Sequence, residues 1–445
     1  MRGTRSMLRT RWAPAAAESR FAGRKASRFL SSKADASAPF LGFSRSNLGL
    51  EQNLVRPVWA SIRQLPEVDA AIDRFPSAAT IDNLKRASDV FASFSKGGRE
   101  HLAVHALLAE CQQRLALYDE AITTLEELQH SLLSSESAQA HCFQEDTVLA
   151  LAKAHWTKGN FGESQVLCET IISTYDDLNE NFPSTNLHLA SAMTGKALSQ
   201  IEGMKSMDDA YSVRDFFRVA IKFLERHPPS ENTLPQAASL SNAGVAEAIY
   251  NMYLQETNDV SVPMTPALRY LFQGLQKTAV SQSSSKQILA ASHAIESSIQ
   301  ANLAWGVLNY EEDKSDRLSK SSEYAKTALS FYDAEGIVGR EGLSWVLTVV
   351  ASCYHQAGSA VTAEGLFQSA ISKNDLPLDP LTTLQLRDAH REYAKLCTQW
   401  ENREKDGQNI EKIAETIEAS LPLNWQGRSS GIHGSLWFWT PGEFL

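Results

Sequence analysis

Residues 148–171 read VLALAKAHWTKGNFGESQVLCETI, and this stretch decides the fold. Four side chains of its first half share one face at 3.6-residue spacing: Val148, Leu151, Ala152 and His155. Gly159 supplies the left-handed residue that commonly ends a helix. In the second half, Ser164, Cys168 and Ile171 share a face. The stretch predicts an antiparallel helix hairpin whose backbones cross at Ala152 and Ser164, where only small residues fit.

The same crossing pattern recurs along the chain. A small residue follows a larger one about every 43 to 60 positions, close to the period at which helix pairs stack into solenoids. The small residues are Ala109, Ala152, Gly195, Gly244, Ala304, Ala351 and Ala394. Alternation at period two, the mark of a half-buried strand, is nearly absent from the 445 residues. The sequence therefore predicts an all-α chain.

Three of these units resemble the tetratricopeptide repeat (TPR), namely those around Ala109, Ala152 and Ala351. Their period is longer than usual and is similar to that of the long-helix variety found in kinesin light chains. Residues 363–371, AEGLFQSAI, resemble the second helix of that variety. The resemblance implies a right-handed superhelical solenoid of six to seven antiparallel helix hairpins. We expect it to cover residues 78–421.

Residues 1–30 have the composition of a transit peptide. They carry eight basic side chains and one acidic side chain, Glu18, and they are rich in Ala and Ser. Residues 28–31, RFLS, resemble the cleavage site of mitochondrial presequences. We therefore expect cleavage before Ser31 and a location in the mitochondrial matrix, with a chloroplast address as the alternative. Residues 31–77 are expected to form a mostly irregular extension.

The net charge bears on nucleic acid binding. The whole chain has a formal charge of −10, and removal of residues 1–30 would bring it to about −17. So acidic a protein repels a phosphate backbone. Pentatricopeptide RNA binders are also mitochondrial helical repeats, but they need basic grooves. Direct nucleic acid binding is therefore disfavoured, although an organellar RNA-associated role remains an alternative.

The sequence contains little that indicates catalysis. P-loop, H-E-x-x-H, G-x-S-x-G and Rossmann patterns are absent from it. His101 and His105 are spaced to share a helix face, but no third metal ligand is visible nearby. We expect no enzyme activity, no cofactor and no metal site. Since no run of 18 apolar residues occurs, we also expect no transmembrane segment. Peripheral contact with the inner membrane remains open.

The TPR resemblance also implies a binding face. In that family the first helix of each hairpin lines the concave side, so a groove would be lined by Lys153, Trp156, Lys196, Trp305, His355 and Lys395. Lysines could hold an acidic peptide or a C-terminal carboxylate, and tryptophans could supply apolar anchors. The alternative is that the lysines are ordinary surface charges and the tryptophans pack between repeats.

Residues 422–445 form an aromatic-rich tail with Trp425, Trp437, Phe438 and Trp439. Large aromatic side chains in a segment without helical periodicity do not stay in water. They predict either a cap on the last hairpin or a docking segment for a partner. A membrane interface, where Trp is favoured, is a further possibility.

Together these features predict a non-catalytic protein-binding scaffold in mitochondria. It would act as an assembly factor or as an accessory subunit of a large complex of the respiratory-chain type. The alternatives are an organellar RNA-associated helical-repeat protein and a plastid assembly factor. The identity of the protein partners cannot be read from the sequence.

Overall fold

The computed structural model describes residues 78–95, 99–133, 138–176, 186–203, 207–226, 234–258, 265–278, 286–310, 314–335, 342–372, 380–400 and 402–427. All of them belong to one compact unit, Ala36–Leu445. Within these ranges the chain forms fifteen α-helices and no strand. The first helices are α4 (Ala78–Ser95), α5 (Arg99–Arg114), α6 (Tyr118–Leu133), α7 (Ala138–Lys158), α8 (Phe161–Asp176), α9 (Asn186–Gly203), α10 (Met207–Arg226) and α11 (Leu234–Asn258). They are followed by α12 (Thr265–Lys277), α13 (Lys286–Tyr310), α14 (Lys314–Glu335), α15 (Leu343–Gln356), α16 (Ala360–Ser372), α17 (Pro380–Thr398) and α18 (Glu404–Ser420).

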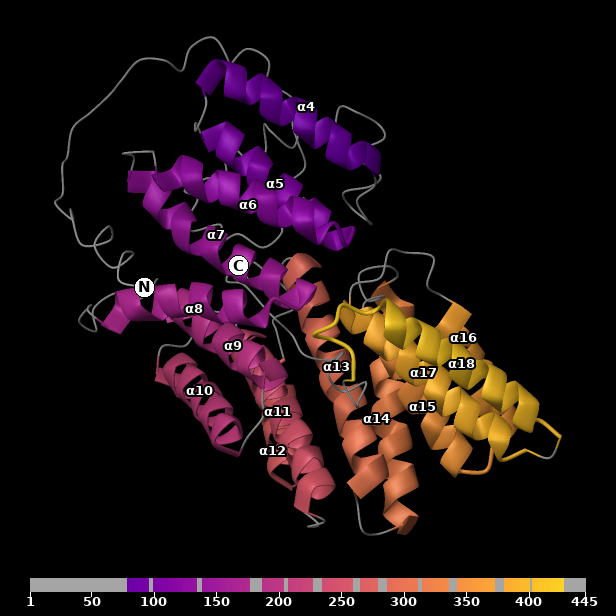
Figure 1. Ribbon diagram of the computed structural model, residues 1–445. Coiled ribbons are helices and arrows are strands. Elements are labelled where there is room, and N and C mark those ends of the chain that lie inside the picture. Colours follow the sequence, from indigo (N-terminus) through magenta and orange to yellow (C-terminus); the bar gives the residue numbers. More distant parts are fainter. Residues whose placement is uncertain are drawn as a thin grey trace. The chain divides into compact units, whose positions relative to one another are not determined.

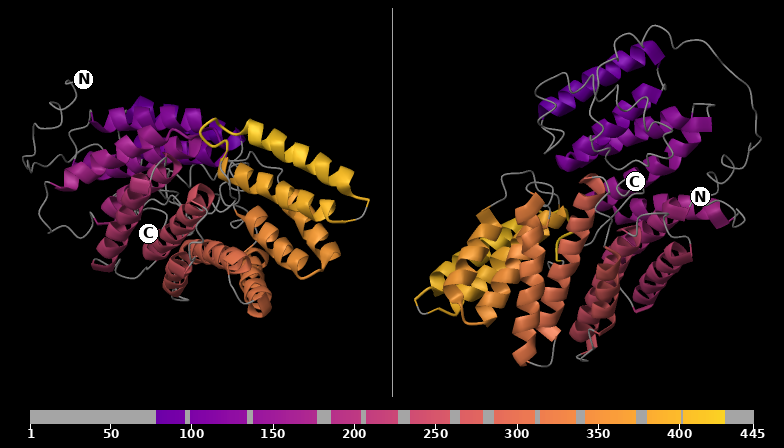
Figure 2. Two further views of the ribbon diagram at one scale, coloured as in Figure 1. Left: turned by 60° about the horizontal axis from the view of Figure 1, so that its bottom comes forward. Right: turned by 180° about the vertical axis from the view of Figure 1, so that it is seen from behind.

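The helices pack in chain order (Figures 1 and 2). Seven antiparallel hairpins pair α5 with α6, α7 with α8, α9 with α10, α11 with α12, α13 with α14, α15 with α16, and α17 with α18. Helix α4 precedes them and packs on α5. Each hairpin also packs on the next one, as stacked repeats do. The predicted all-α solenoid of six to seven helix hairpins is confirmed for the described part of the chain.

Three hairpins turn in the same way. In the turn after α7, Gly159 has a φ of 90°. Its N–H donates to the Trp156 carbonyl at 2.9 Å, and the Asn160 N–H donates to the His155 carbonyl at 2.8 Å. This pair of bonds is the Schellman motif that closes helix ends. The turn after α15 repeats it with Gly358 (φ 78°), and the turn after α5 repeats it with Ala116 (φ 57°).

The second helices of the same hairpins share a buried stripe. Ala121, Ser164 and Ala363 occupy matching positions of these second helices, and all three are fully buried. Four residues later, Leu125, Cys168 and Phe367 are also fully buried. About one turn of helix separates the two rows, so both lie on the same buried face of the second helix. Burial also raises the pKa of the Cys168 thiol to about 12, which keeps this thiol protonated.

Glycines mark other close crossings. A Cβ added to Gly244 of α11 would lie 2.8 Å from Cγ of Leu271 in α12. A Cβ added to Gly306 of α13 would lie 2.8 Å from Cδ2 of Leu268. Both distances are too short for real carbon atoms, so these helices can approach only where the side chain is missing. The sequence predicted Gly244 as a crossing residue, and the contact with Leu271 confirms it.

The first helices of the hairpins form a circuit of contacts. Helix α7 packs on α9, α9 on α11, α11 on α13, α13 on α15, and α15 on α17. Helix α17 in turn contacts α7. Each second helix, by contrast, packs mainly on the helices that precede and follow it. The six odd-numbered helices from α7 to α17, called here the inner helices, therefore lie on the closely packed side of the solenoid.

The inner helices are buried over unusually long runs. All residues from 234 to 250 in α11 are buried, as are residues 343–350 in α15 and 384–390 in α17. A helix on one face of a solenoid normally has a stripe exposed to water. Burial around the whole circumference follows in part from the circuit, because each inner helix has neighbours on several sides.

Candidate functional site

The six side chains predicted for a groove all lie on inner helices. Lys153 and Trp156 come from α7, Lys196 from α9, Trp305 from α13, His355 from α15 and Lys395 from α17. Trp156 is buried, Lys395 is exposed, and the other four are half-buried. All six therefore lie on the first helices of hairpins, and this placement does not test which face of its helix each side chain occupies. Whether they bind a partner stays a prediction.

Lys196 is held by its own neighbours. Its ammonium lies 3.0 Å from a carboxylate oxygen of Glu169 in α8 and 4.3 Å from the ring centre of Phe216 in α10. Burial works to raise the pKa of Glu169, but hydrogen bonds from Gln165 and Lys196 outweigh it and lower that pKa. An acidic ligand would therefore have to compete with Glu169 for Lys196.

Trp305 and His355 each bridge neighbouring helices. The ring of Trp305 lies 6.5 Å from that of Trp345 in α15, and the Trp345 indole donates to Asn302 at 3.2 Å. His355 donates from Nε2 to the Gln399 side-chain oxygen at 2.7 Å, just after α17. Lys395 pairs at 2.7 Å with Glu392 on its own helix. Trp305 and His355 thus both contact the following repeat, and the alternative reading expected such a contact for the tryptophans.

Trp156 has a specific partner within the chain. The segment of residues 421–427, called here the C-terminal clasp, follows α18 and carries Trp425, which is fully buried. The Trp425 ring lies edge-on to two other rings, with its centre 5.6 Å from that of Trp156 and 5.1 Å from that of Phe161. Edge-to-face pairs at such distances are favourable. The clasp therefore reaches from the end of the last hairpin to the turn between α7 and α8.

Two hydrogen bonds accompany this aromatic contact. The Trp425 indole N–H donates to the Thr157 carbonyl at 3.1 Å, and the Asn424 amide donates to the Gly159 carbonyl at 2.8 Å. Thr157 lies in the last turn of α7 and Gly159 directly follows the helix, so no next turn of helix remains to satisfy either carbonyl. The clasp therefore supplies two donors to acceptors that the helix leaves open.

The clasp is itself a tight turn. The Trp425 N–H donates to the Pro422 carbonyl at 2.7 Å, and the Gln426 amide donates to the Leu421 carbonyl at 2.8 Å. Leu421 is buried, whereas the intervening Leu423 is 84% exposed. The turn thus presents Leu421 and Trp425 on one side and leaves Leu423 in water.

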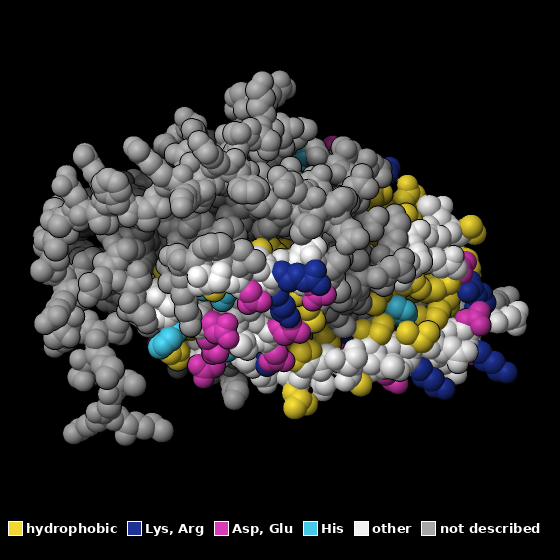
Figure 3. Space-filling view, turned by 90° about the horizontal axis from the view of Figure 1, so that it is seen from above, with side chains coloured by type: hydrophobic (Ala, Val, Ile, Leu, Met, Phe, Trp, Pro, Cys, Tyr) yellow, Lys and Arg dark blue, Asp and Glu magenta, His cyan; other side chains and the backbone are white. Residues whose placement is uncertain are grey.

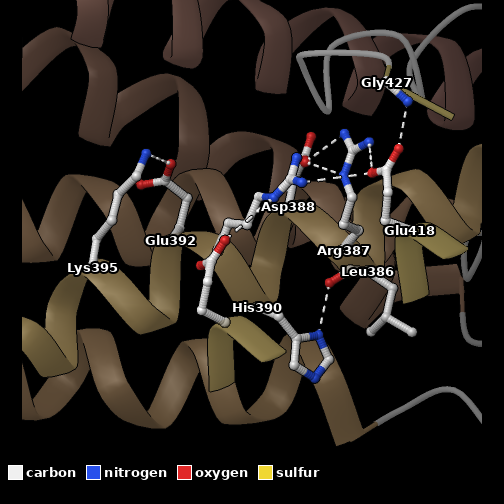
Figure 4. A network of polar contacts seen from close by, with 10 residues as sticks. Leu386, Arg387, Asp388, His390, Glu392, Lys395, Glu418 and Gly427 are labelled. Atoms are coloured by element: carbon white, nitrogen blue, oxygen red, sulfur yellow. Dashed lines mark hydrogen bonds and ion pairs between the residues drawn. The ribbon is translucent and has the colours of Figure 1, made fainter. Parts of the chain in front are cut away.

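An ion network fixes the helices that carry the clasp (Figure 4). The fully buried guanidinium of Arg387 in α17 lies 2.7 Å from Asp388 and 2.6 Å from Glu418 in α18. Glu418 also accepts a hydrogen bond from the Gly427 N–H at the end of the clasp. Burial raises the pKa of Asp388 in spite of its arginine neighbour. Arg387 therefore links the last two helices and the clasp through one carboxylate.

Other buried polar pairs join successive hairpins. His188 in α9 donates to Asp146 in α7 at 2.8 Å, and both side chains are buried. Arg214 in α10 donates to the buried Glu247 in α11 at 2.6 Å. Removing either member of a buried pair would destabilise the fold, because it leaves an unpaired charge in the interior. These pairs therefore belong to the packing between repeats.

The two histidines of the first hairpin lie together. The rings of His101 and His105 are 4.4 Å apart. Burial and the nearby His101 lower the pKa of His105 to about 4, and the opposing effect of Asp89, which raises that pKa, is smaller. Among the described residues, no group of three potential metal ligands occurs. Over all the described ranges, no helix is both long and apolar enough to cross a membrane.

Charge is mixed on the surface. On the face drawn in Figure 3, coloured Lys and Arg side chains lie beside Asp and Glu side chains. Ion pairs between partly exposed side chains also occur elsewhere in the described chain, such as Lys320 with Asp316 and Arg391 with Glu411. Nucleic acid binding relies on basic side chains gathered along one surface. This face does not have that pattern among its coloured side chains.

Several predictions concern residues outside the described ranges. They are the presequence of residues 1–30, the extension of residues 31–77 and the aromatic side chains Trp437, Phe438 and Trp439. Of the aromatic residues after Pro422, Trp425 is described, and it docks on the second of the seven hairpins. The sequence singled out Trp425 as an aromatic that would not stay in water. It gave no sign of the docking site, which the pair Trp156 and Phe161 forms.

No protein-family model matches the chain, and no curated protein matches it. Among solved structures, the chain is similar to one in the human IFIT1 dimer with m7Gppp-AAAA, with 14% sequence identity and a TM-score of 0.36. The match covers 78% of this chain and 66% of that chain. The stacked hairpins themselves define the class of this protein, which is a helical-repeat α-solenoid.

Proposed function

We propose that this chain is a non-catalytic scaffold that binds other proteins through its inner helices. The observation that supports the proposal is the placement of the six predicted groove residues on inner helices, on five of the six. A stack of repeats presents one extended surface, which suits long protein segments better than small molecules. The half-buried Lys153 and Trp305 lie on this surface, in α7 and α13.

The proposed ligand is an acidic peptide or a C-terminal carboxylate. Lys196 and Lys395 are paired with Glu169 and Glu392 at partly exposed positions. Such pairs contribute little, on the order of 0–1 kcal/mol, so a partner carboxylate can replace them at small cost. A ligand with several acidic residues would gain from the row of lysines as a whole.

The proposed address is the mitochondrial matrix, and the proposed role is that of an assembly factor or accessory subunit of a large respiratory-type complex. The Arg-rich, acid-poor composition of residues 1–30 supports the address. Cell fractionation and sequencing of the mature N-terminus test it. Cleavage before Ser31 is expected, while an intact Met1 in the cytosol would overturn it. Sedimentation of mitochondrial extracts separates the roles, because only a subunit co-migrates constantly with its complex.

A charge-reversal experiment tests the binding face. Affinity purification from isolated mitochondria would compare the wild type with a variant in which Lys153, Lys196 and Lys395 are all changed to Glu. The matched control changes Lys222, Lys326 and Lys412 to Glu, three exposed lysines on second helices. Loss of the captured partner from the first variant alone supports the proposal. Equal capture by both variants, with unchanged circular dichroism, would contradict it.

A further inference from the structure

The turn between α7 and α8 differs from the other turns of its kind. Three hairpins share the same turn geometry, after α5, α7 and α15. Only the turn after α7 has two large aromatic residues beside it, Trp156 and Phe161. The corresponding residues are Gln113 and Tyr118 in the first case and His355 and Ala360 in the last. The aromatic pair therefore goes beyond what the turn itself requires.

Space around the turns shows the same difference. A Cβ added to Gly358 in the turn after α15 would meet no atom within 4 Å. A Cβ added to Gly159 would lie 3.1 Å from Cδ1 and 3.2 Å from Nε1 of Trp425. The turn after α7 is therefore covered by the clasp, while the matching turn after α15 faces open space.

The site and the clasp are complementary in both shape and polarity. Trp156 and Phe161 form two walls that the Trp425 ring meets edge-on. The carbonyls of Thr157 and Gly159 accept the two side-chain donors of Trp425 and Asn424. An Asn-Trp dipeptide on a tight turn thus fills every feature of the site.

The contact is small for one that joins distant parts of a chain. Burying one aromatic side chain removes about 150–250 Å² from water, compared with roughly 1,600 Å² in a standard stable interface. Contacts of this size hold because the chain tethers both sides at high effective concentration. Local opening of such a contact costs much less than unfolding the solenoid.

We propose that the α7–α8 turn is a binding site for an Asn-Trp turn motif, which the chain's own residues 421–427 occupy as a releasable latch. The C-terminal clasp, which acts as this latch, lies beside the contact between α17 and α7, where the circuit of inner helices closes. Its release loosens that closure and exposes Trp156 and Phe161. The same site then accepts the motif when it is supplied on a separate peptide. This inference does not depend on the identity of the scaffold's partner.

Hydrogen–deuterium exchange on the full chain tests the latch. Trp425→Ala is compared with Leu423→Ala, a control in the same turn at an exposed position. Amides of residues 155–164 are expected to exchange about tenfold faster or more in Trp425→Ala, with helices other than α7, α8 and α17 unchanged, because local opening is governed by local contacts. Leu423→Ala should match the wild type. Unchanged exchange in Trp425→Ala would overturn the proposal.

A peptide experiment tests whether the site works in trans. A synthetic peptide of residues 420–428, SLPLNWQGR, is added to the Trp425→Ala protein. Restored protection of residues 155–164 is expected, and the same peptide with Ala in place of Trp should have no effect. Failure of the native peptide to bind would overturn the proposal.

The remaining outcome concerns stability. If Trp425→Ala loses most of its helical circular dichroism, the clasp is a fixed part of the core and the proposal is wrong. Asn424→Ala provides a milder second variant, since it removes one hydrogen bond and leaves the ring in place. It is expected to speed exchange of residues 155–164 by a smaller factor than Trp425→Ala.

Discussion

The indole nitrogen of Trp425 lies 3.1 Å from the carbonyl oxygen of Thr157, a residue 268 positions earlier in the chain. In a solenoid, most contacts join a repeat to its neighbours. This contact instead joins the end of the last hairpin to the second, in the same region where α17 touches α7. The solenoid is therefore closed on itself at this point, and several of its expected properties follow from that closure.

Replacing Gly159 with Ala should cost more stability than replacing Gly358 with Ala. Both residues have a positive φ, so each alanine would adopt a left-handed conformation and lose about 1–2 kcal/mol of stability. Only the Cβ at position 159 approaches Trp425, which must then shift. Urea denaturation of both variants measures the difference, which we expect to be on the order of 1 kcal/mol or more. Equal losses would mean that the clasp does not press on Gly159.

Replacing Ala116 with Gly should stabilise the chain. Ala116 occupies the position of Gly159 and Gly358 in the turn after α5, with a φ of 57°. Glycine removes the steric penalty of this conformation, so a gain of about 0.5–1 kcal/mol is expected after the entropy cost is subtracted. Ala357→Gly is the control, since Ala357 has an ordinary φ of −78°. That control should lose stability, and a loss at both positions would contradict the prediction.

Much of the repeat could be predicted because packing in a solenoid is local. Ala152, Ser164 and Cys168 follow the helical period, and all three are fully buried. Gly159 has the left-handed conformation that its place after the helix indicates. These features depend only on residues within one hairpin, so the sequence of that hairpin is enough to identify them.

The clasp could not be predicted in the same way. The partner of Trp156 depends on how far the stack turns over five further hairpins, and periodicity carries no such information. Arg387 is similar, because the helical pattern gives no sign that an arginine is fully buried against Asp388 and Glu418. The prediction that Trp156 meets a partner protein remains untested, although it now has an intramolecular neighbour.

Ala152→Leu should destabilise the chain by about 1–3 kcal/mol, because the extra carbons have no space where α7 and α8 cross. Lys153→Leu, one residue further on, should cost much less, since Lys153 is half-buried whereas Ala152 is fully buried. Thermal unfolding of both variants measures the contrast. Similar losses for the two would show that the phase of α7 has been assigned incorrectly.

Arg387→Ala should be among the most damaging single substitutions. The guanidinium is fully buried between Asp388 and Glu418, so its removal leaves a buried carboxyl group without its counter-ion. Removing one partner of such a buried pair lowers the free energy of unfolding by about 3–5 kcal/mol. Arg391→Ala, at a partly exposed position on the same helix, should cost less than about 1 kcal/mol. Urea midpoints of both variants test the contrast, and a mild effect of Arg387→Ala would contradict the network in Figure 4.

Mild acid should weaken the first hairpins through His105. Its pKa is about 4 in the folded chain, against an ordinary value of 6.5. The unfolded chain therefore binds the proton more readily, so stability is fully present above pH 6.5 and falls as the pH drops towards 4. Converted to free energy, this pKa difference sets an upper limit of about 3 kcal/mol on the stability lost in acid, and partial exposure of the ring reduces that loss. His105→Gln should make the stability profile shallower over this window, and burial of His155 and His390, which also lowers their pKa values, leaves part of the slope in place. A His105→Gln profile as steep as that of the wild type would show that another group is responsible for the acid sensitivity.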